Sequence, residues 1–194
     1  MKQNGNILFS GVGGQGILLA SELTAYAQLE AGFDVKKSEV HGMAQRGGSV
    51  VAHLRYGEKI YSPLIEPGKA DIQVAFEEME AARYLPYLHK DSAVVVNTQR
   101  ILPPAVATGL AEYPDNLLDE LKDRGINVVA VDAFSVAKEI GELRTANVVM
   151  VGAMSNFLAV SPQIFLDVID KKVKEQFREV NKKAFAAGRE LVKT

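Results

Sequence analysis

The sequence predicts a single α/β domain, a Rossmann-like three-layer sandwich with a mostly parallel sheet and a helical C-terminal region. Apolar, β-rich segments alternate with helical patterns up to about residue 133, which is the signature of helices packed on a parallel sheet. Residues 92–98 and 126–133 are continuous apolar runs, typical of central strands covered on both faces. No strand pattern is evident after Thr145. The expected domain spans residues 1–194.

The N-terminal half contains the more regular patterns. The expected elements are a strand over 6–10, a glycine turn over 11–16, a helix over 15–31, strands over 33–40 and 49–56, a turn with a return strand over 58–65, and a strand over 70–76. Gly32 is a natural stop for the helix. The strand over 49–56 alternates, and we expect it to pair locally with the strand before it.

The C-terminal half is expected to be mainly helical. The predicted elements are helices over 77–88 and 115–125, a loop over 99–109, a helix over 145–160, a helix starting at Ser161-Pro162, and helical spacing through the tail over 171–191. The lysines of this tail are interpreted as a solvated face, with a basic partner-binding helix as the minority alternative.

Composition excludes several classes of function. The chain has 194 residues, 47% of them apolar, and a formal net charge of −2, so nothing indicates binding to nucleic acid or to an anionic membrane. It has no cysteine, which rules out disulfides, thiolate zinc sites and iron–sulfur ligation within this chain. Its three histidines have no metal-site spacing. No signal peptide is visible, so we expect a cytoplasmic protein without bound metal.

The first motif is a glycine loop, Gly11-Val12-Gly13-Gly14-Gln15-Gly16, between a predicted strand and a predicted helix. Such a loop lets the backbone approach a ligand closely, and the free N–H groups and dipole of the helix then favour a phosphate. The alternative is a tight turn that needs glycine for packing alone. We favour a ligand that carries phosphate.

A nicotinamide or flavin dinucleotide is the obvious specific ligand for this pattern. Glu39 lies about twenty residues past the last glycine, where an acid would hold a ribose. However, Lys36 and Lys37 lie on the same strand, and a glycine loop follows it where a crossover helix is required. We therefore retain the predicted phosphate site, whereas these residues argue against a nicotinamide dinucleotide as its ligand.

The second motif is the stretch SEVHGMAQRGGSV, residues 38–50. His41, Gln45 and Arg46 offer hydrogen-bond donors for an oxygen-rich ligand, and Gly47 and Gly48 let the backbone fold closely. A mobile surface loop is the plain alternative, but a site or an interface is favoured because functional residues collect on such loops. The cations Lys36, Lys37, Arg46 and Arg55 are expected to add positive potential near it.

The two motifs together resemble a known family. The stretch from GVGGQG to VVAHLRYG, with ADIQVAFEEMEAARYL, VVVN, VVMVGAMSNFLAV and NKKAFAAG, is similar to the gamma-type subunit or domain of the 2-oxoacid:ferredoxin oxidoreductases, nearest to the enzymes for indolepyruvate. The resemblance covers nearly the whole chain. The combination of GVGGQG with KSEVHGMAQRGGSV is its specific part.

The resemblance implies a role in an assembly. These enzymes decarboxylate a 2-oxoacid, here an aryl pyruvate, on thiamine diphosphate, pass electrons through 4Fe-4S clusters to ferredoxin, and transfer the acyl group to coenzyme A. Both cofactors belong to a large partner subunit. By position, the residues that would cradle the diphosphate of coenzyme A are Gly11, Gly13, Gly14, Gln15 and Gly16. Those that would face the catalytic subunit are Ser38, Glu39, His41, Gln45, Arg46, Gly47 and Gly48.

Neither loop supplies a nucleophile or a metal ligand, so this chain is expected to assist the chemistry of a partner. Two rival interpretations stay open: a stand-alone nicotinamide dehydrogenase, and a non-enzymatic nucleotide-binding or scaffold protein. The sequence leaves undetermined which 2-oxoacid is used, the subunit stoichiometry, and whether the first glycine loop holds coenzyme A or is only a turn.

Overall fold

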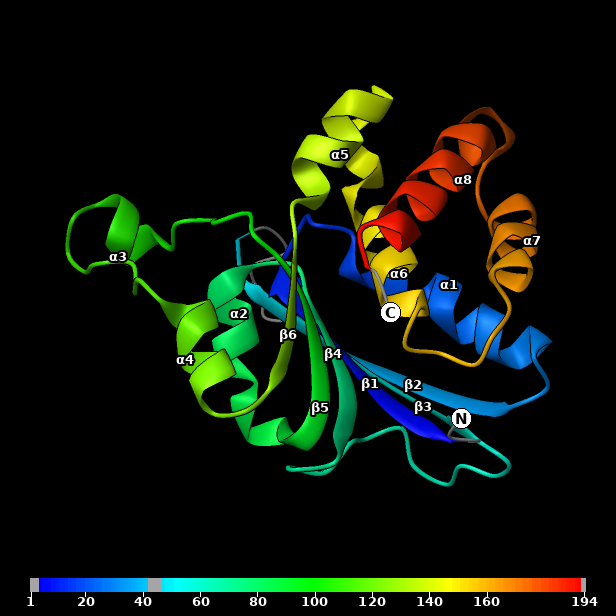
Figure 1. The fold of residues 1–194 in the computed structure, drawn as a ribbon, viewed down its shortest axis with the longest axis horizontal. Helices are drawn as coiled ribbons and strands as arrows, with labels where there is room; N and C mark the ends of the chain where they lie inside the picture. Colours follow the sequence, from blue (N-terminus) through cyan, green and yellow to red (C-terminus); the bar gives the residue numbers. More distant parts are fainter. Residues whose placement is uncertain (1–3, 42–46, 193–194) are drawn as a thin grey trace.

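The computed structural model describes residues 4–41 and 47–192 (Figure 1). Within these ranges the strands are β1 (Gly5–Val12), β2 (Asp34–His41), β3 (Ser49–Gly57), β4 (Ala70–Ala75), β5 (Leu88–Asn97) and β6 (Asn127–Val131). They form one sheet in the order β2-β3-β1-β4-β5-β6. The α/β fold that the sequence predicts is confirmed.

The sheet has a parallel part and an antiparallel edge. β1, β4, β5 and β6 are parallel neighbours, whereas β3 is antiparallel to both β1 and β2. A parallel connection needs a crossover of a dozen or more residues. The segment 42–48 between β2 and β3 is too short for one, so these two strands pair directly, as the sequence predicts.

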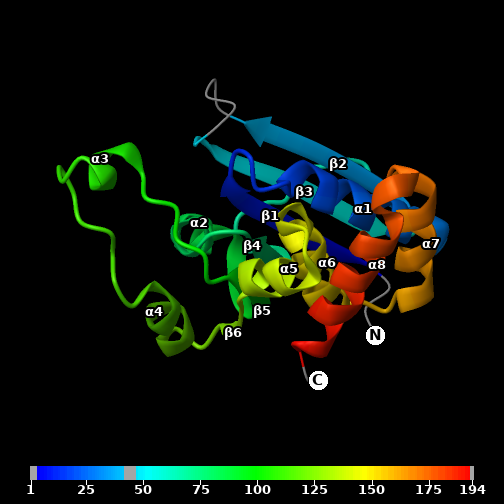
Figure 2. The same ribbon diagram turned by 90° about the horizontal axis from the view of Figure 1, so that it is seen from above.

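The helices form a layer on each face of the parallel part (Figures 1 and 2). The helical elements are α1 (Ile17–Glu30), α2 (Glu78–Arg83), η1 (Leu85–Tyr87), α3 (Pro104–Ala107), α4 (Leu117–Asp123), α5 (Ala133–Ile140), η2 (Leu143–Thr145), α6 (Ala146–Ser155), α7 (Pro162–Lys172) and α8 (Glu175–Glu190). One face carries α1 and the C-terminal helices, and the other carries α2 and α4.

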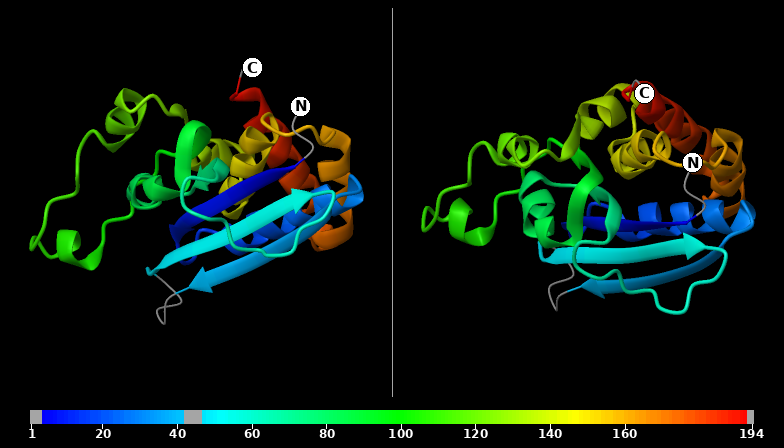
Figure 3. Two further views of the ribbon diagram at one scale, coloured as in Figure 1. Left: turned by 90° about the horizontal axis from the view of Figure 1, so that it is seen from below. Right: turned by 60° about the horizontal axis from the view of Figure 1, so that its bottom comes forward.

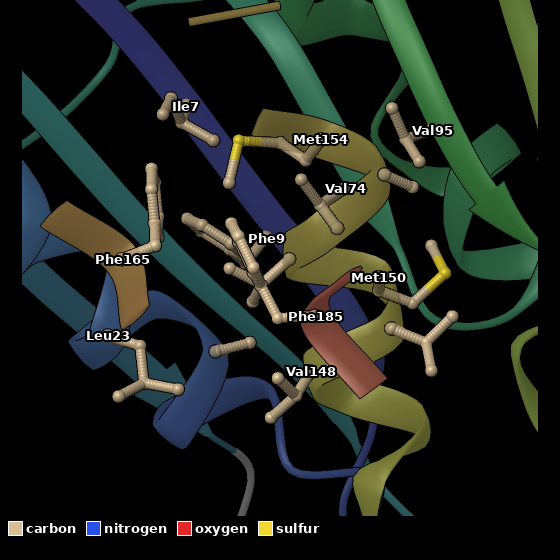
Figure 4. Packing of buried hydrophobic residues seen from close by; sticks show 14 of the residues in the cluster. Ile7, Phe9, Leu23, Val74, Val95, Val148, Met150, Met154, Phe165 and Phe185 are labelled. Carbon is tan, nitrogen blue, oxygen red and sulfur yellow. The ribbon is translucent and has the colours of Figure 1, made fainter. Parts of the chain in front are cut away.

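The larger core lies between the sheet and the C-terminal helices (Figure 4). Phe9 and Val74 project from the sheet toward Met150 and Met154 of α6, and these side chains are buried. Burial of apolar area of this kind contributes roughly 25 cal/mol per Å² and is the main stabilising term of the fold. The predicted apolar face of β3, with Val50, Ala52 and Leu54, belongs to this core.

Helices α6 and α8 touch backbone to backbone. A Cβ added at Gly152 would overlap the carbonyl oxygen of Phe185, and one added at Gly188 would overlap that of Val149. The two glycines thus set the distance between the helices. This close approach buries nearly all of α6 and fixes its N-terminal end beside the first glycine loop.

A smaller set of helices packs on the second face of the sheet. α2 and α4 pack on β5 and β4 through Ala81, Leu121, Val94 and Val96. Beside them, the irregular segment over residues 58–69 crosses the sheet near β3, where Ile65 is buried (Figure 3). Its backbone is held by Arg55 and His53, whose side chains bond to it directly.

Several predicted elements differ from the structure. The return strand over 58–65 is wrong, because that segment is irregular and its hydrogen bonds go to side chains. The predicted loop over 99–109 contains the short helix α3, and the predicted helix over 77–88 ends at Arg83, followed by η1. α5 follows the strand β6 where no helix is expected. The tail is helical as predicted, but α7 ends at Lys172 and α8 begins at Glu175.

Over residues 4–41 and 47–192, no helix has both the length and the apolar character needed to cross a membrane.

Candidate functional site: two glycine loops at one edge of the sheet

The two glycine loops of the sequence meet in space. The Gly13 N–H donates to the Gly48 carbonyl oxygen at 2.8 Å, and the Gly47 N–H donates to the Gly13 carbonyl oxygen at 3.3 Å. β1 and β3 pair up to Val12 and Ser49, so these bonds extend the antiparallel ladder by one step. The backbone at Gly13 is therefore fixed directly by the second motif.

Gln15 holds the first loop in shape. Its side-chain Oε1 accepts from the Val12 N–H at 2.8 Å, and its Nε2 donates to the Phe76 carbonyl oxygen at 2.7 Å. Gly11 is needed for this packing, because a Cβ there would lie 2.8 Å from Phe76 Cβ. Gly11 and Gln15 thus shape the loop, and the Gln15 side chain is directed at the protein rather than outward.

Within residues 4–41 and 47–192, no side chain caps the N-terminal end of α1. Its N-cap residue Gly16 has φ +80° and gives no side-chain cap, and the first turn has no acidic residue. Gly14 has φ +109° and open space where a side chain would project. Uncapped N–H groups and the helix dipole together favour an anion at this point.

Helix α2 gives the opposite picture. It begins after β4, and its N-cap residue Glu77 accepts from the Glu80 N–H at 3.1 Å. Glu78 and Glu80 lie in its first turn, and all three carboxylates are buried. These carboxylates of the chain itself therefore already occupy the positive N-terminal end of the α2 dipole. Of the two helices that follow β1 and β4, α1 is therefore the one whose N-terminus is open to an external anion.

The sheet places α1 at a favoured position for a ligand. β1 is followed by α1 on one face, and its parallel neighbour β4 is followed by α2 on the other face (Figure 2). The chain therefore changes direction between these two strands. In open α/β sheets, ligands bind in the crevice at the carboxyl ends of strands at such a switch point.

Two hollows flank the first glycine loop. The first, of about 430 Å³, is lined by Gly13, Gly14, Gly16, Ile17, Leu18, His41 and Val50. The second, of about 530 Å³, is lined by Gly13, Gly14, Gln15, Gly16, Leu19, Phe76, Asn97, Gln99, Ile101, Phe134, Leu143, Arg144, Ala146 and Asn147. The shared glycines form the ridge between them. Volumes of this size suit a small organic ligand.

Among the described residues that line the second hollow, Arg144 is the cation. Arg144 forms two hydrogen bonds with Glu142, at 2.7 and 2.9 Å, and its guanidinium lies 5.1 Å from the centre of the Phe177 ring. This pairing lowers the pKa of Glu142 to about 2. Arg144 is thus held in place while its side chain stays largely exposed, so it can still face an anionic group at the mouth of the hollow.

The predicted residues of the second motif separate into two groups. His41 lines the first hollow, beside the glycine loop. Side chains alternate along β2, so Glu39 shares the face of His41, whereas Ser38 projects from the opposite face, level with His53. Ser38 is therefore not brought to the hollow. Gln45 and Arg46 lie outside the described residues.

The expected positive potential near the second motif is not found among the described cations. Lys36 pairs with Asp34 at 2.8 Å, and Lys37 pairs with Glu39. Arg55 lies at the far end of β1, level with Asn6, to which it donates. The ion pair of Glu39 also removes the free acid that a nicotinamide ribose requires, which counts against the dinucleotide interpretation.

Sequence reasoning missed Asn147. Its Nδ2 donates to the Gly16 carbonyl oxygen at 3.2 Å, and a Cβ on Gly16 would overlap the same amide. Asn97 likewise joins β5 to β4 and α5, by bonds to Phe76 and Ala133. These contacts join residues up to 131 positions apart, and no local pattern marks them. The available signal is an Asn near the start of α6, a helix that is mainly apolar.

Comparison with known proteins identifies the family of this chain. The family model described as pyruvate ferredoxin/flavodoxin oxidoreductase matches residues 6–191. The chain belongs to this oxidoreductase family. A protein named indolepyruvate oxidoreductase subunit IorB, from Thermococcus kodakarensis, is 44% identical over 190 residues, which cover 94% of this chain and 93% of that protein. The resemblance that the two glycine motifs predict is thus confirmed.

Solved structures of the oxidoreductase family have the same fold. The gamma subunit of a keto/oxoacid ferredoxin oxidoreductase from Geobacter sulfurreducens gives a TM-score of 0.71 at 25% identity, covering 96% of both chains. A 2-oxoglutarate:ferredoxin oxidoreductase from Magnetococcus marinus, solved with 2-oxoglutarate, coenzyme A and succinyl-CoA bound, gives 0.77 at 22% identity. It covers 98% of this chain but only 31% of that longer chain. The fold therefore occurs both as a separate subunit and within a larger polypeptide.

Proposed function

We propose that the chain is the small subunit of a cytoplasmic 2-oxoacid:ferredoxin oxidoreductase that acts on indolepyruvate or related aryl pyruvates. In this proposal a large partner subunit carries thiamine diphosphate and the 4Fe-4S clusters, and ferredoxin accepts the electrons. The small subunit contributes the glycine-loop ridge, which binds the diphosphate of coenzyme A. The name of the Thermococcus kodakarensis relative supports the choice of substrate.

The observation that carries the proposal is the uncapped start of α1 between two hollows, with Gly13 held by the second motif. A diphosphate beside Gly14 and Gly16 would accept hydrogen bonds from backbone N–H groups at the start of α1, where Gly16 supplies no side-chain cap. The Gly13 N–H is already bonded to the Gly48 carbonyl oxygen, so Gly13 would contribute only the space that its missing side chain leaves. The rest of coenzyme A has room on either side of the ridge, in hollows of about 430 and 530 Å³. The coenzyme A present in the Magnetococcus marinus structure supports this choice of ligand.

The division of labour follows from the residues of the chain. A sequence without cysteine offers no ligand set for an iron–sulfur cluster, so electron transfer belongs to a partner. Thiamine diphosphate in that partner would supply the decarboxylation chemistry. This chain would bind and orient coenzyme A, with His41 and the second motif at the rim that faces the partner.

Reconstitution tests the proposal. The isolated chain and its co-purified complex are each assayed anaerobically with indolepyruvate, coenzyme A and a viologen acceptor, and their visible spectra are recorded. We expect the isolated chain to be colourless and inactive, and the complex to show cluster absorbance and to require coenzyme A. Pyruvate and 2-oxoglutarate serve as comparison substrates. Turnover by the isolated chain, or a complex that prefers those two acids, would count against the proposal.

A further inference from the structure

The segment between β5 and α4 stands away from the body of the molecule. We call residues 99–116 the arm. The arm runs out from the sheet, contains α3 at its outer end and returns to α4 (Figures 1 and 2). Both views show α3 well apart from the other helices. The arm begins at the carboxyl end of β5, so it leaves the same edge of the sheet that carries the glycine loops.

The composition of the arm is unusual for an exposed segment. Between Ile101 and Pro114 the single charged residue is Glu112. Leu110 is 84% exposed and Leu102 is 53% exposed. Isolated exposed leucines are ordinary, but an almost uncharged projecting segment is not.

Hydrogen bonds hold both the outgoing and the returning part of the arm at its base. Arg100 Nε donates to Glu78 at 2.8 Å, and the same guanidinium donates to Asp115 at 3.3 Å, which ties the outgoing and returning parts together. On the returning part, the Tyr113 hydroxyl donates to the buried Glu77 at 2.5 Å. Glu77 also accepts from the Ile101 N–H at 3.3 Å. The buried N-cap acid of α2 thus fixes the base of the arm, which reduces the ordering cost of a contact farther out.

The arm is continuous with the glycine-loop site. Gln99 and Ile101, at its base, line the second hollow together with Gly14 and Asn147. A molecule that contacts the base of the arm therefore also lies beside this hollow.

We propose that the arm is a docking element for the large catalytic subunit, which it would hold over the second hollow. The inference rests on the proposed function, because that function requires a partner at this edge. A second copy of this chain fits less well, since it would cover the hollow without supplying thiamine diphosphate or clusters. The nearly uncharged surface suits a permanent subunit contact, in which apolar area dominates.

The test measures how tightly the small subunit binds the catalytic subunit. Leu102→Asp combined with Leu110→Asp places two carboxylates in the contact, and Leu110→Asp alone is the second variant. The matched control is Leu64→Asp, because Leu64 is also 53% exposed but lies on the segment that precedes β4, at the opposite end of the parallel strands. Each labelled small subunit is titrated with wild-type catalytic subunit, and each free subunit is melted.

We expect the double variant to bind at least about tenfold more weakly, with the single variant between it and the wild type. The control should bind normally, and no free subunit should lose thermal stability. Binding of both arm variants with wild-type affinity overturns the inference. The inference is also overturned if the free chain self-associates, the arm variants abolish that self-association, and the complex with the catalytic subunit still forms. If the wild-type chain binds no catalytic subunit at all, the proposed function itself has failed.

Discussion

Gln15 shows how one side chain can fix a loop without touching a ligand. Its two bonds connect the first glycine loop with the end of β4. Replacement by leucine leaves the Val12 N–H without its acceptor, whereas the Phe76 carbonyl keeps a second donor in Asn97. We expect Gln15→Leu to lower the free energy of unfolding by about 1–2 kcal/mol. Urea denaturation measures this, with Gln163→Leu, at an exposed helix position, as the control. Equal stability of both variants would mean that the loop holds its shape without Gln15.

His53 links stability to pH. Its Nδ1 accepts from the Ile65 N–H at 3.2 Å, so the folded state holds the neutral ring, and burial lowers the pKa of His53 below its ordinary value. As pH falls below about 6.5, the unfolded chain takes up this proton before the folded chain does. The stabilising contribution is therefore complete above that pH and is lost below it.

The pH dependence can be isolated with His53→Asn, which keeps an acceptor near the Nδ1 position but does not titrate. Denaturant unfolding at about pH 7.5 and pH 5.5 gives the loss of stability for each protein. We expect the wild type to lose more than the variant over this interval. A wild-type loss no larger than that of the variant would show that His53 titrates normally in the folded protein.

At the scale of elements, the contact between α6 and α8 depends on two glycines. We expect Gly188→Ala to destabilise the protein by about 1–3 kcal/mol, because its methyl group would overlap the carbonyl oxygen of Val149 and force the helices apart. The control is Lys183→Ala, at an exposed position of α8, which should be close to neutral. Since α6 carries Asn147, the displacement should also disturb the glycine loop. A neutral Gly188→Ala would show that the helices do not touch as described.

The elements that sequence analysis could predict are those with a local signal. The strand before GVGGQG, the helix after it and the apolar runs in β5 and β6 follow from period and composition. The pairing of β2 with β3 follows from the shortness of the connection between them. The segment over 58–65 has a strand-like composition, but the side chains of Arg55, His53 and Asp34 satisfy its backbone instead of a neighbouring strand.

The site was only partly predictable, because only some of its residues carry a local sequence signal. The glycine loops carry their own signal, and the predicted roles of Gly13, Gly14, Gly16 and His41 remain predictions that the geometry supports. The remaining wall of the second hollow comes from α1, from the ends of β4 and β5, from the residues after β5, and from α5, η2 and α6. These residues are remote in sequence, and only the packing of α6 against the sheet brings Arg144 and Asn147 to the loop.

At the scale of the whole molecule, the fold gathers the start of α1, the second-motif residues His41, Gly47 and Gly48, and the base of the arm at one edge of the sheet. Figure 2 shows the start of α1 and the arm from above. The opposite edge ends in turns and the irregular segment over 58–69. This asymmetry fits a subunit that contributes one working surface to a larger enzyme. In the proposed function, the ridge at Gly13 binds coenzyme A on behalf of that enzyme.

The most direct test compares the wild-type complex with Gly13→Val in two reactions. The first is reduction of the partner's clusters by the 2-oxoacid without coenzyme A, followed by visible absorbance; the second is full turnover as a function of coenzyme A concentration. A side chain at Gly13 blocks the approach of a diphosphate to the helix start. We expect an assembled complex with unchanged cluster reduction and a KM for coenzyme A raised by about tenfold or more. An assembled variant complex with an unchanged KM for coenzyme A would contradict it.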